Sequence, residues 1–315
     1  MSANFLFVHV NEWADDASPD AIPISQGYIL AGLQKNGFSG RILGDYQDQP
    51  LTPARFRQHF QSLQPAAVGF SVYEENVSRV RLWARFAKSL DPGVVIVLGG
   101  PQVTFMPAAA LEQMSEADIL CRGSGETVFL ALARALNGSS NLHHVPGICY
   151  LEHGRVVETA PCSRPENLDD LPSPYLEGTL DVTGKSRVML LTSRGCTSPC
   201  TFCYTTRASG GRVRFHSLER IISEMRCLRN QGIDDFWFAD PNFAHSRQRL
   251  ERLLQAVIEV GHEVHGILID VRQHLAGNPR QTRLRITHCR RRVIVHTAEV
   301  TLPVNQGVAH GEVLS

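Results

Sequence analysis

Three cysteines stand close together in the middle of the chain. Cys196, Cys200 and Cys203 have a C-x3-C-x2-C spacing and follow an expected strand, residues 187–192. Among the chain's eight cysteines, two more at these offsets would arise by chance at roughly five in a thousand. Three thiolates on a short loop can each bind one iron of a [4Fe-4S] cluster, which leaves the fourth iron open to a substrate. The spacing therefore predicts an iron–sulfur site at the end of a strand.

Two other metal sites remain open at this point. A structural zinc site would need a fourth Cys or His, for which His216 is the candidate. An iron–sulfur electron carrier would need four protein ligands. The other five cysteines carry no pattern, and we expect Cys121 and Cys149 to be core residues because they lie in apolar runs.

The composition is that of an ordinary globular protein, with 43% hydrophobic and 20% charged residues. Lys plus Arg and Asp plus Glu both number 31, so the net charge attracts neither nucleic acid nor an anionic membrane. The N-terminus lacks a signal sequence, and no stretch nears the roughly 18 to 20 apolar residues of a membrane span. We expect a cytoplasmic protein with neither a membrane nor a nucleic acid as partner.

The first 140 residues repeat a strand followed by a helix. Residues 5–10, 66–72 and 94–98 are apolar runs, interrupted only by His9 and Ser71, which is typical of parallel strands covered by helices on both faces. This pattern predicts an α/β, doubly wound (Rossmann-like) domain over residues 1–140. Ligand contacts are expected in the loops beyond the carboxyl ends of its strands.

The rest of the chain falls into three parts. Residues 141–185 read as a hairpin and a Pro-rich linker. Residues 186–272 contain three strands and two helices, about half of a (β/α) barrel. Residues 273–315 form an atypical Arg-rich tail, since no Asp or Glu occurs from 271 to 298. A basic tail, an RNA-binding patch, and a frameshift or loss of the true C-terminus would each explain it; we favour the third, because no aromatic residue follows Phe243.

An expected strand followed by C-x3-C-x-aromatic-C, with Phe202 as the aromatic residue, resembles the corresponding segment of the radical S-adenosylmethionine enzymes. The preceding domain resembles the cobalamin (B12)-binding domain fused to many of them. The resemblance covers residues 1–272. In the first domain and the linker it depends on the order of four short segments: AVGFSV at 67–72, VLGGP at 97–101, RGSGE at 122–126 and LDDLP at 168–172.

The resemblance implies a mechanism in which Cys196, Cys200 and Cys203 hold a [4Fe-4S] cluster. S-adenosylmethionine would chelate the open iron, and one electron from the cluster would cleave it to a 5′-deoxyadenosyl radical. The positions expected to contact S-adenosylmethionine are Phe202, Asp240, Asn242 and Arg272. An equally good interpretation of residues 240–243 is a turn that caps the following helix.

Cobalamin is the third cofactor that the resemblance implies. Its expected contacts are Ser71, Gly99, Gly100 and Gly123, where small residues allow close approach. The D-x-H-x-x-G motif that supplies a cobalt ligand in other cobalamin domains is absent after the first strand, so ligation by histidine is not predicted. Plain glycine turns between strand and helix are the alternative interpretation.

The expected function is thus that of a cobalamin-dependent radical S-adenosylmethionine enzyme. The resemblance points to a methyltransferase acting on an unactivated carbon or a phosphorus centre in specialised metabolism, with no catalytic residue singled out beyond the cluster. Its partners would be a small-molecule or peptide substrate and an external electron donor such as flavodoxin or ferredoxin. The rival is a cobalamin-binding module whose radical half is truncated and inactive.

Overall fold

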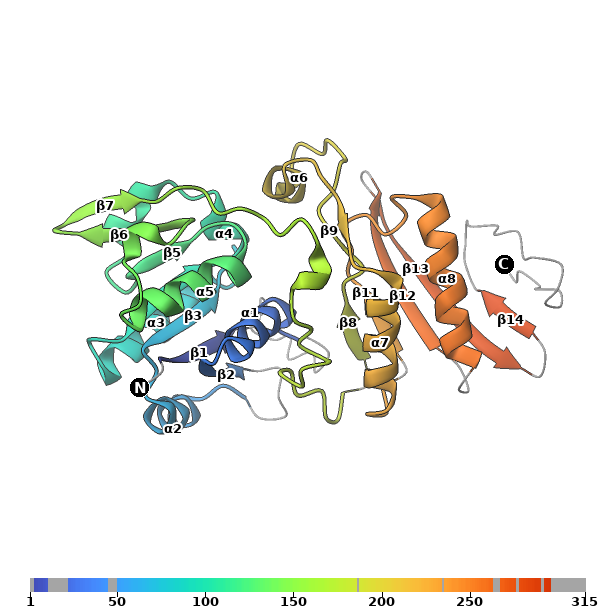
Figure 1. The fold of residues 1–315 in the computed structure, drawn as a ribbon, viewed down its shortest axis with the longest axis horizontal. Helices are drawn as coiled ribbons and strands as arrows, with labels where there is room; N and C mark the ends of the chain where they lie inside the picture. The colour runs from blue at the N-terminus through green and yellow to red at the C-terminus, as the bar shows by residue number, and fades with distance from the viewer. Residues whose placement is uncertain are drawn as a thin grey trace. The chain divides into compact units, whose positions relative to one another are not determined.

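The computed structural model describes residues 3–10, 22–44, 50–185, 187–233, 235–262, 267–275, 278–289 and 292–295. Contacts divide the chain into two units. Unit 1 comprises Met1–Glu166 and Asp170–Leu180, and unit 2 comprises Asn167–Asp169 and Asp181–Ser315. Each unit is built on its own sheet (Figure 1). No helix in the described part of the chain is long and apolar enough to cross a membrane.

Unit 1 contains a seven-stranded sheet in the order β2-β1-β3-β4-β5-β6-β7. The first five strands in this order are parallel, and β6 and β7 extend the sheet as an antiparallel hairpin. The strands are β1 (Asn4–His9), β2 (Ser39–Gly44), β3 (Ala67–Ser71), β4 (Val95–Gly99), β5 (Ile119–Cys121), β6 (Ile148–Glu152) and β7 (Arg155–Glu158). The parallel order 2-1-3-4-5 is that of a doubly wound sheet of the flavodoxin type. The predicted fold class is confirmed, and the hairpin expected after residue 140 lies in unit 1.

Helices cover both faces of this sheet. The main helices are α1 (Ile24–Lys35), α2 (Pro53–Leu63), α3 (Val77–Leu90) and α5 (Gly125–Leu136), with the shorter α4 (Pro101–Thr104), η1 (Ala108–Gln113) and η2 (Leu142–His144). Leu6 of β1 belongs to the same buried cluster as Phe56 of α2 and Val80 of α3. Its neighbour Phe7 faces the other way and packs on Phe129 of α5, with ring centroids 5.1 Å apart. Because alternate side chains of β1 enter different cores, all the residues between its polar ends, Asn4 and His9, must be apolar.

Unit 2 contains a five-stranded sheet in the order β14-β13-β12-β11-β8 and a two-stranded sheet of β9 and β10. The strands are β8 (Arg187–Leu190), β9 (Ser193–Arg194), β10 (Arg214–Phe215), β11 (Asp235–Phe238), β12 (Ile267–Leu275), β13 (Asn278–Cys289) and β14 (Arg292–Val295). The helices are η3 (Leu168–Asp170), α6 (Tyr204–Ser209), α7 (Leu218–Arg229) and α8 (Arg247–His262). Strands β8, β11 and β12 are parallel; with α7 and α8 they form the part of a barrel that the sequence predicts. Antiparallel strands β13 and β14 fall in the Arg-rich segment.

Candidate functional site

The cysteine loop leaves the sheet of unit 2 just after β8. The short strand β9 pairs with β10 and leads to Gly195, which directly precedes Cys196. Gly195 has φ +99°, and a Cβ there would clash with the carbonyl oxygen of Arg212. Both the left-handed backbone and the close approach require glycine at this position. The fold thus fixes the backbone at the start of the loop.

The three thiols of the loop differ in exposure. Cys196 is buried, and its Sγ accepts a hydrogen bond from the backbone amide of Ser198 at 3.4 Å. Cys200 and Cys203 are partly exposed, and the amide of Cys203 donates to the carbonyl of Cys200 at 3.2 Å in a tight turn. Cys203 also precedes α6 as its N-terminal capping residue. None of the three is in a disulfide.

The donor set of this loop fits a cluster that takes three cysteine thiolates. The side chains, however, are not arranged as metal ligands: within the described ranges, no group of three or more His, Cys, Asp or Glu side chains could hold a metal ion. The thiols would therefore have to move together to hold a cluster. The same holds for the zinc alternative, because His216 is not gathered with the cysteines in that part of the chain; its Nδ1 binds Asp169 at 3.0 Å.

Asp240, two residues after the end of β11, binds the segment that leads into the cysteine loop. Its carboxylate is 3% exposed and accepts hydrogen bonds from the amide of Thr192 at 3.1 Å and from the Thr192 hydroxyl at 3.2 Å. The Ser193 hydroxyl donates to the same carboxylate at 2.5 Å. Burial raises the pKa of Asp240, and these hydrogen bonds oppose the shift. The contacts hold the backbone three and four residues before Cys196.

Arg249 of α8 binds the same segment through its carbonyl groups. Its Nη2 donates to the carbonyl oxygen of Thr192 at 3.0 Å and to that of His216 at 2.9 Å. The guanidinium also lies over the ring of Phe215, 4.3 Å from the ring centroid. Thr192 is therefore held at its amide by Asp240 and at its carbonyl by Arg249.

Asp169 joins this network from the Pro-rich segment. Its carboxylate accepts hydrogen bonds from the Nδ1–H of His216 and, at 3.1 Å, from the amide of Ser217, the N-cap residue of α7. His216 is 1% exposed, and burial lowers its pKa to about 4 although Asp169 opposes the shift. His216 is therefore neutral at pH 7. The sequence did not predict this role of Asp169, because the LDDLP segment was used only for its resemblance to a family. Asp169 and His216 are 47 residues apart, and no spacing pattern predicts a contact between such distant residues.

The other positions expected at S-adenosylmethionine have different surroundings. Phe202 is 81% exposed on the cysteine loop. Asn242 is partly buried in the turn after β11, where its carbonyl accepts from the amide of His245 at 3.3 Å. The cap of α8 is Ser246, whose Oγ accepts from the amide of Arg249 at 3.4 Å, so residues 240–243 form a turn without capping the helix. Arg272 pairs with Gln281 in the β12–β13 register, and its side chain lies outside the described residues.

The positions expected at cobalamin lie along one edge of the sheet of unit 1. Ser71 and Gly99 end the adjacent parallel strands β3 and β4, and Gly123 follows β5. Gly100 has φ +102°, and a Cβ there would lie 2.9 Å from both the amide nitrogen and the carbonyl oxygen of Val72. The contact with Val72 alone therefore requires glycine at residue 100, without any ligand. This agrees with the alternative interpretation of a plain glycine turn between strand and helix. At Gly99 a Cβ would meet Cys121 only at an ordinary 3.6 Å.

A buried asparagine that the sequence analysis missed joins the ends of β1 and β3. The Nδ2 of Asn76 donates to the carbonyls of Val10 at 3.0 Å and Ser71 at 3.1 Å, and its Oδ1 accepts from the amide of Tyr73 at 2.9 Å. Strands β1 and β3 flank the point where the strand order reverses, the usual place for a ligand in such sheets. The segment after β1 that lacks the histidine motif lies outside the described residues.

Known proteins match this chain in its first unit and over most of its length. The family model for the B12 binding domain matches residues 14–133. An uncharacterized methyltransferase of Pyrococcus horikoshii is 29% identical over 232 residues, covering 72% of this chain and 50% of that protein. The cobalamin-dependent radical SAM methyltransferase TokK of Streptomyces tokunonensis is 29% identical over 250 residues, covering 76% of this chain and 35% of its own length. The chain thus spans half or less of the length of these curated relatives.

A solved structure shows the same fold across both units. It is the radical S-adenosylmethionine methyltransferase TsrM of Kitasatospora setae, with cobalamin and a [4Fe-4S] cluster bound. It matches with a TM-score of 0.68 at 21% identity, over 84% of this chain and 52% of that one. The first unit of the chain thus matches the B12 binding domain, and the chain is similar in sequence to cobalamin-dependent radical SAM methyltransferases and in fold to one whose structure is solved.

Proposed function

We propose that this chain carries the cofactor-binding part of a cobalamin-dependent radical S-adenosylmethionine methyltransferase. The observation that carries the proposal is the C-x3-C-x2-C loop at the end of β8, which follows a doubly wound B12-binding domain in the same chain. Relatives that are named as methyltransferases support methyl transfer as the reaction. An unactivated carbon or a phosphorus centre of a small molecule or peptide is the proposed acceptor.

In this proposal each part of the chain has a defined task. Cys196, Cys200 and Cys203 hold the [4Fe-4S] cluster, and Asp240 and Arg249 fix the backbone from which the loop starts. Phe202, with its exposed ring, packs beside S-adenosylmethionine. When bound, the cluster and S-adenosylmethionine supply one-electron chemistry, and cobalamin supplies the methyl group. The protein works in the cytoplasm with an external reductant of the flavodoxin or ferredoxin type.

A cobalamin-binding module with an inactive radical half is the second candidate. It is favoured by the placement of the thiols, which are not gathered around a common point among the described residues. This candidate predicts bound cobalamin in a chain that does not cleave S-adenosylmethionine.

Product analysis separates the two candidates. The full chain would be reconstituted anoxically with iron, sulfide and hydroxocobalamin and incubated with S-adenosylmethionine and dithionite. The enzyme predicts S-adenosylmethionine-derived products, 5′-deoxyadenosine or S-adenosylhomocysteine, in mass spectra, and their loss in a Cys196, Cys200, Cys203→Ala variant that still binds cobalamin. Bound cobalamin without any such product from the wild-type chain would contradict the enzyme and leave the binding module.

A further inference from the structure

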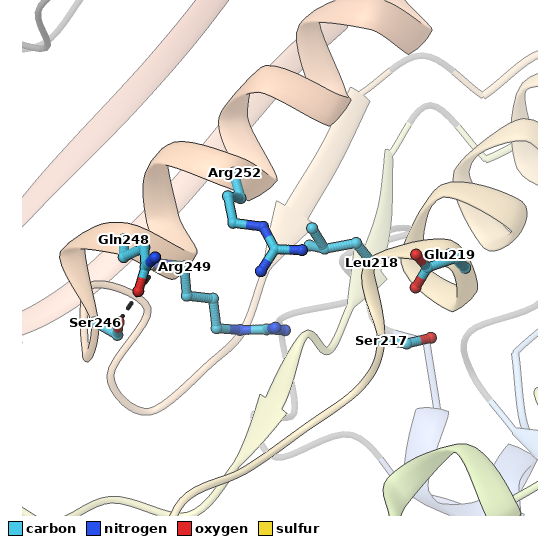
Figure 2. A pocket seen from close by; sticks show the side chains of 7 residues that line it. All are labelled: Ser217, Leu218, Glu219, Ser246, Gln248, Arg249 and Arg252. Carbon is cyan, nitrogen blue, oxygen red and sulfur yellow. Dashed lines mark hydrogen bonds between the residues drawn. The ribbon is translucent and has the colours of Figure 1, made fainter.

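Arg249, in the wall of the cavity between α7 and α8, has its charge and its donors balanced within the chain. Figure 2 shows its side chain among the residues that line this cavity. It donates to two carbonyl oxygens. Burial lowers the pKa of Arg249, whereas the nearby carboxylates of Asp240 and Asp169 raise it. The chain itself therefore accounts for this buried polar side chain.

A buried side chain of unit 1 is not accounted for in this way. Gln26 lies in the first turn of α1 and is 2% exposed. Its Nε2 donates a hydrogen bond to the carbonyl oxygen of Val8 at 3.0 Å. Its Oε1 is buried as well, and no donor in the described part of the chain bonds to it. A buried carbonyl oxygen that has lost its bonds to water without replacement is unfavourable and uncommon in folded proteins.

The contact with Val8 fixes the orientation of the Gln26 amide. Exchanging its two ends would place Oε1 against the carbonyl oxygen of Val8, and two acceptors do not form a hydrogen bond. Nε2 must therefore face Val8, and Oε1 must face away from it. The unpaired acceptor is thus a property of the site, whichever way the amide is turned.

Gln26 lies at the carboxyl edge of the sheet of unit 1. Val8 is the last residue but one of β1, and it pairs with Phe70 of β3, which directly precedes Ser71 at the end of that strand. Strands β1 and β3 flank the reversal of strand order, where doubly wound sheets bind their ligands. Gln26 also falls within the segment that matches the B12 binding domain. A ligand bound at this edge is therefore the natural source of the missing donor.

We propose that the Oε1 of Gln26 accepts a hydrogen bond from a carboxamide side chain of cobalamin. This inference rests on the proposed function, and it adds a binding residue that the sequence analysis did not expect. The corrin ring carries peripheral carboxamides, whose NH₂ groups are donors that suit an amide oxygen. Because Oε1 is buried in the chain without cofactor, the bond forms as the chain around Gln26 rearranges on binding.

Absorbance titration of the full chain with hydroxocobalamin tests this proposal. Gln26→Met keeps the length of the side chain and removes both of its polar atoms, so it should weaken binding about tenfold, the loss of one buried hydrogen bond. Cobinamide, which keeps the carboxamides but lacks the nucleotide tail, should show the same loss. Gln34→Met is the matched control. Gln34 is exposed on the same helix, where its Oε1 accepts from the hydroxyl of Thr179, and its replacement should change the affinity less than about twofold.

Urea unfolding without cobalamin separates this role from a structural one. Removing an unpaired acceptor offsets the lost bond to Val8, so Gln26→Met should shift the unfolding midpoint by less than about 0.5 M. A midpoint lowered by more than about 1 M would show that the chain itself uses Oε1, and would overturn the proposal.

The binding results separate this inference from the proposed function. Equal affinities of the wild type and Gln26→Met would overturn the inference and leave the proposed function intact. A loss seen with cobalamin but not with cobinamide would move the contact to the nucleotide tail and overturn the assignment to a carboxamide. A wild-type chain that binds neither probe would overturn the proposed function and this inference together.

Discussion

The carboxylate of Asp240 holds Thr192 at two points, because it accepts hydrogen bonds from both the backbone amide and the side-chain hydroxyl of that residue. Thr192 lies four residues before Cys196, and its carbonyl is bound by Arg249. Asp240, which the sequence analysis expected to contact S-adenosylmethionine, thus fixes the start of the cysteine loop in this structure. Contact between Asp240 and S-adenosylmethionine itself stays a prediction.

Replacing Asp240 by Ala should destabilise unit 2 by about 3 kcal/mol, since the change leaves three buried donors without their acceptor. Asp240→Asn keeps one acceptor oxygen and should cost about half as much. Urea unfolding measures both effects. Glu251→Gln, which breaks only an exposed pair on α8, is the control and should change stability by less than about 0.5 kcal/mol. A cost for Asp240→Ala no larger than that of the control would show that the network contributes little.

His216 should make the stability of unit 2 depend on pH. Its pKa is about 4 in the folded chain and near 6.5 when unfolded. Below pH 6.5 the unfolded state therefore binds the proton first, and stability falls as the pH drops from 6.5 toward 4. On the order of 2 kcal/mol should be lost between pH 7 and pH 5.

The measurement is urea unfolding at several pH values, for the wild type and for His216→Asn. The variant should be less stable at pH 7 but should show a flatter profile between pH 7 and pH 5. Parallel profiles for the two proteins would mean that another group causes the pH dependence. Asp169 is a separate contributor, because its lowered pKa adds stability that is lost only at more acidic pH.

Gly100→Ala should destabilise unit 1 by about 3 kcal/mol, because it combines a left-handed backbone with a 2.9 Å contact between Cβ and the Val72 backbone. Gly138→Ala is the matched control. Gly138 has φ +77°, and a Cβ there would meet nothing within 4 Å, so only backbone strain of about 1 kcal/mol is expected. Thermal unfolding without cobalamin compares them, and equal losses would contradict the role of the Val72 contact.

Sequence alone predicted the parts of the fold that depend on continuous apolar patterns. Strands β3 and β4 are apolar up to their last residues because both faces of the sheet are covered, so the sequence predicts both the strands and their parallel pairing. The three cysteines could also be recognised from the sequence, because they are close together in the chain and their spacing indicates a shared ligand.

Contacts between distant segments could not be predicted in this way. Asp169 caps α7 from 48 residues away, and Arg249 reaches Thr192 across 57 residues. Asp240 was noticed as a polar residue at a strand end, but a strand end does not show whether its side chain faces a ligand or the loop beside it. Asn76 is an ordinary residue before a helix in the sequence, and only the fold shows that it bridges β1 and β3.

Phe202→Ala should leave the stability of the chain unchanged within about 0.5 kcal/mol, because the ring is 81% exposed. Under the proposed function it should raise the S-adenosylmethionine concentration needed to change the spectrum of the reduced cluster by about tenfold. Leu82→Ala, at an exposed position on α3, is the control and should change neither property. An unchanged titration for Phe202→Ala would remove the ring from the binding site.

The most direct test of the central claim is the metal content and the EPR spectrum of the anoxically reconstituted chain, recorded with and without S-adenosylmethionine. The account predicts about four iron atoms and as many sulfides per chain, and a reduced-cluster spectrum that changes when S-adenosylmethionine is added. Iron should be lost in the Cys196, Cys200, Cys203→Ala variant and retained in a Cys162, Cys227→Ala control. Zinc in place of iron, iron that persists in the triple variant, or a spectrum indifferent to S-adenosylmethionine would contradict the account.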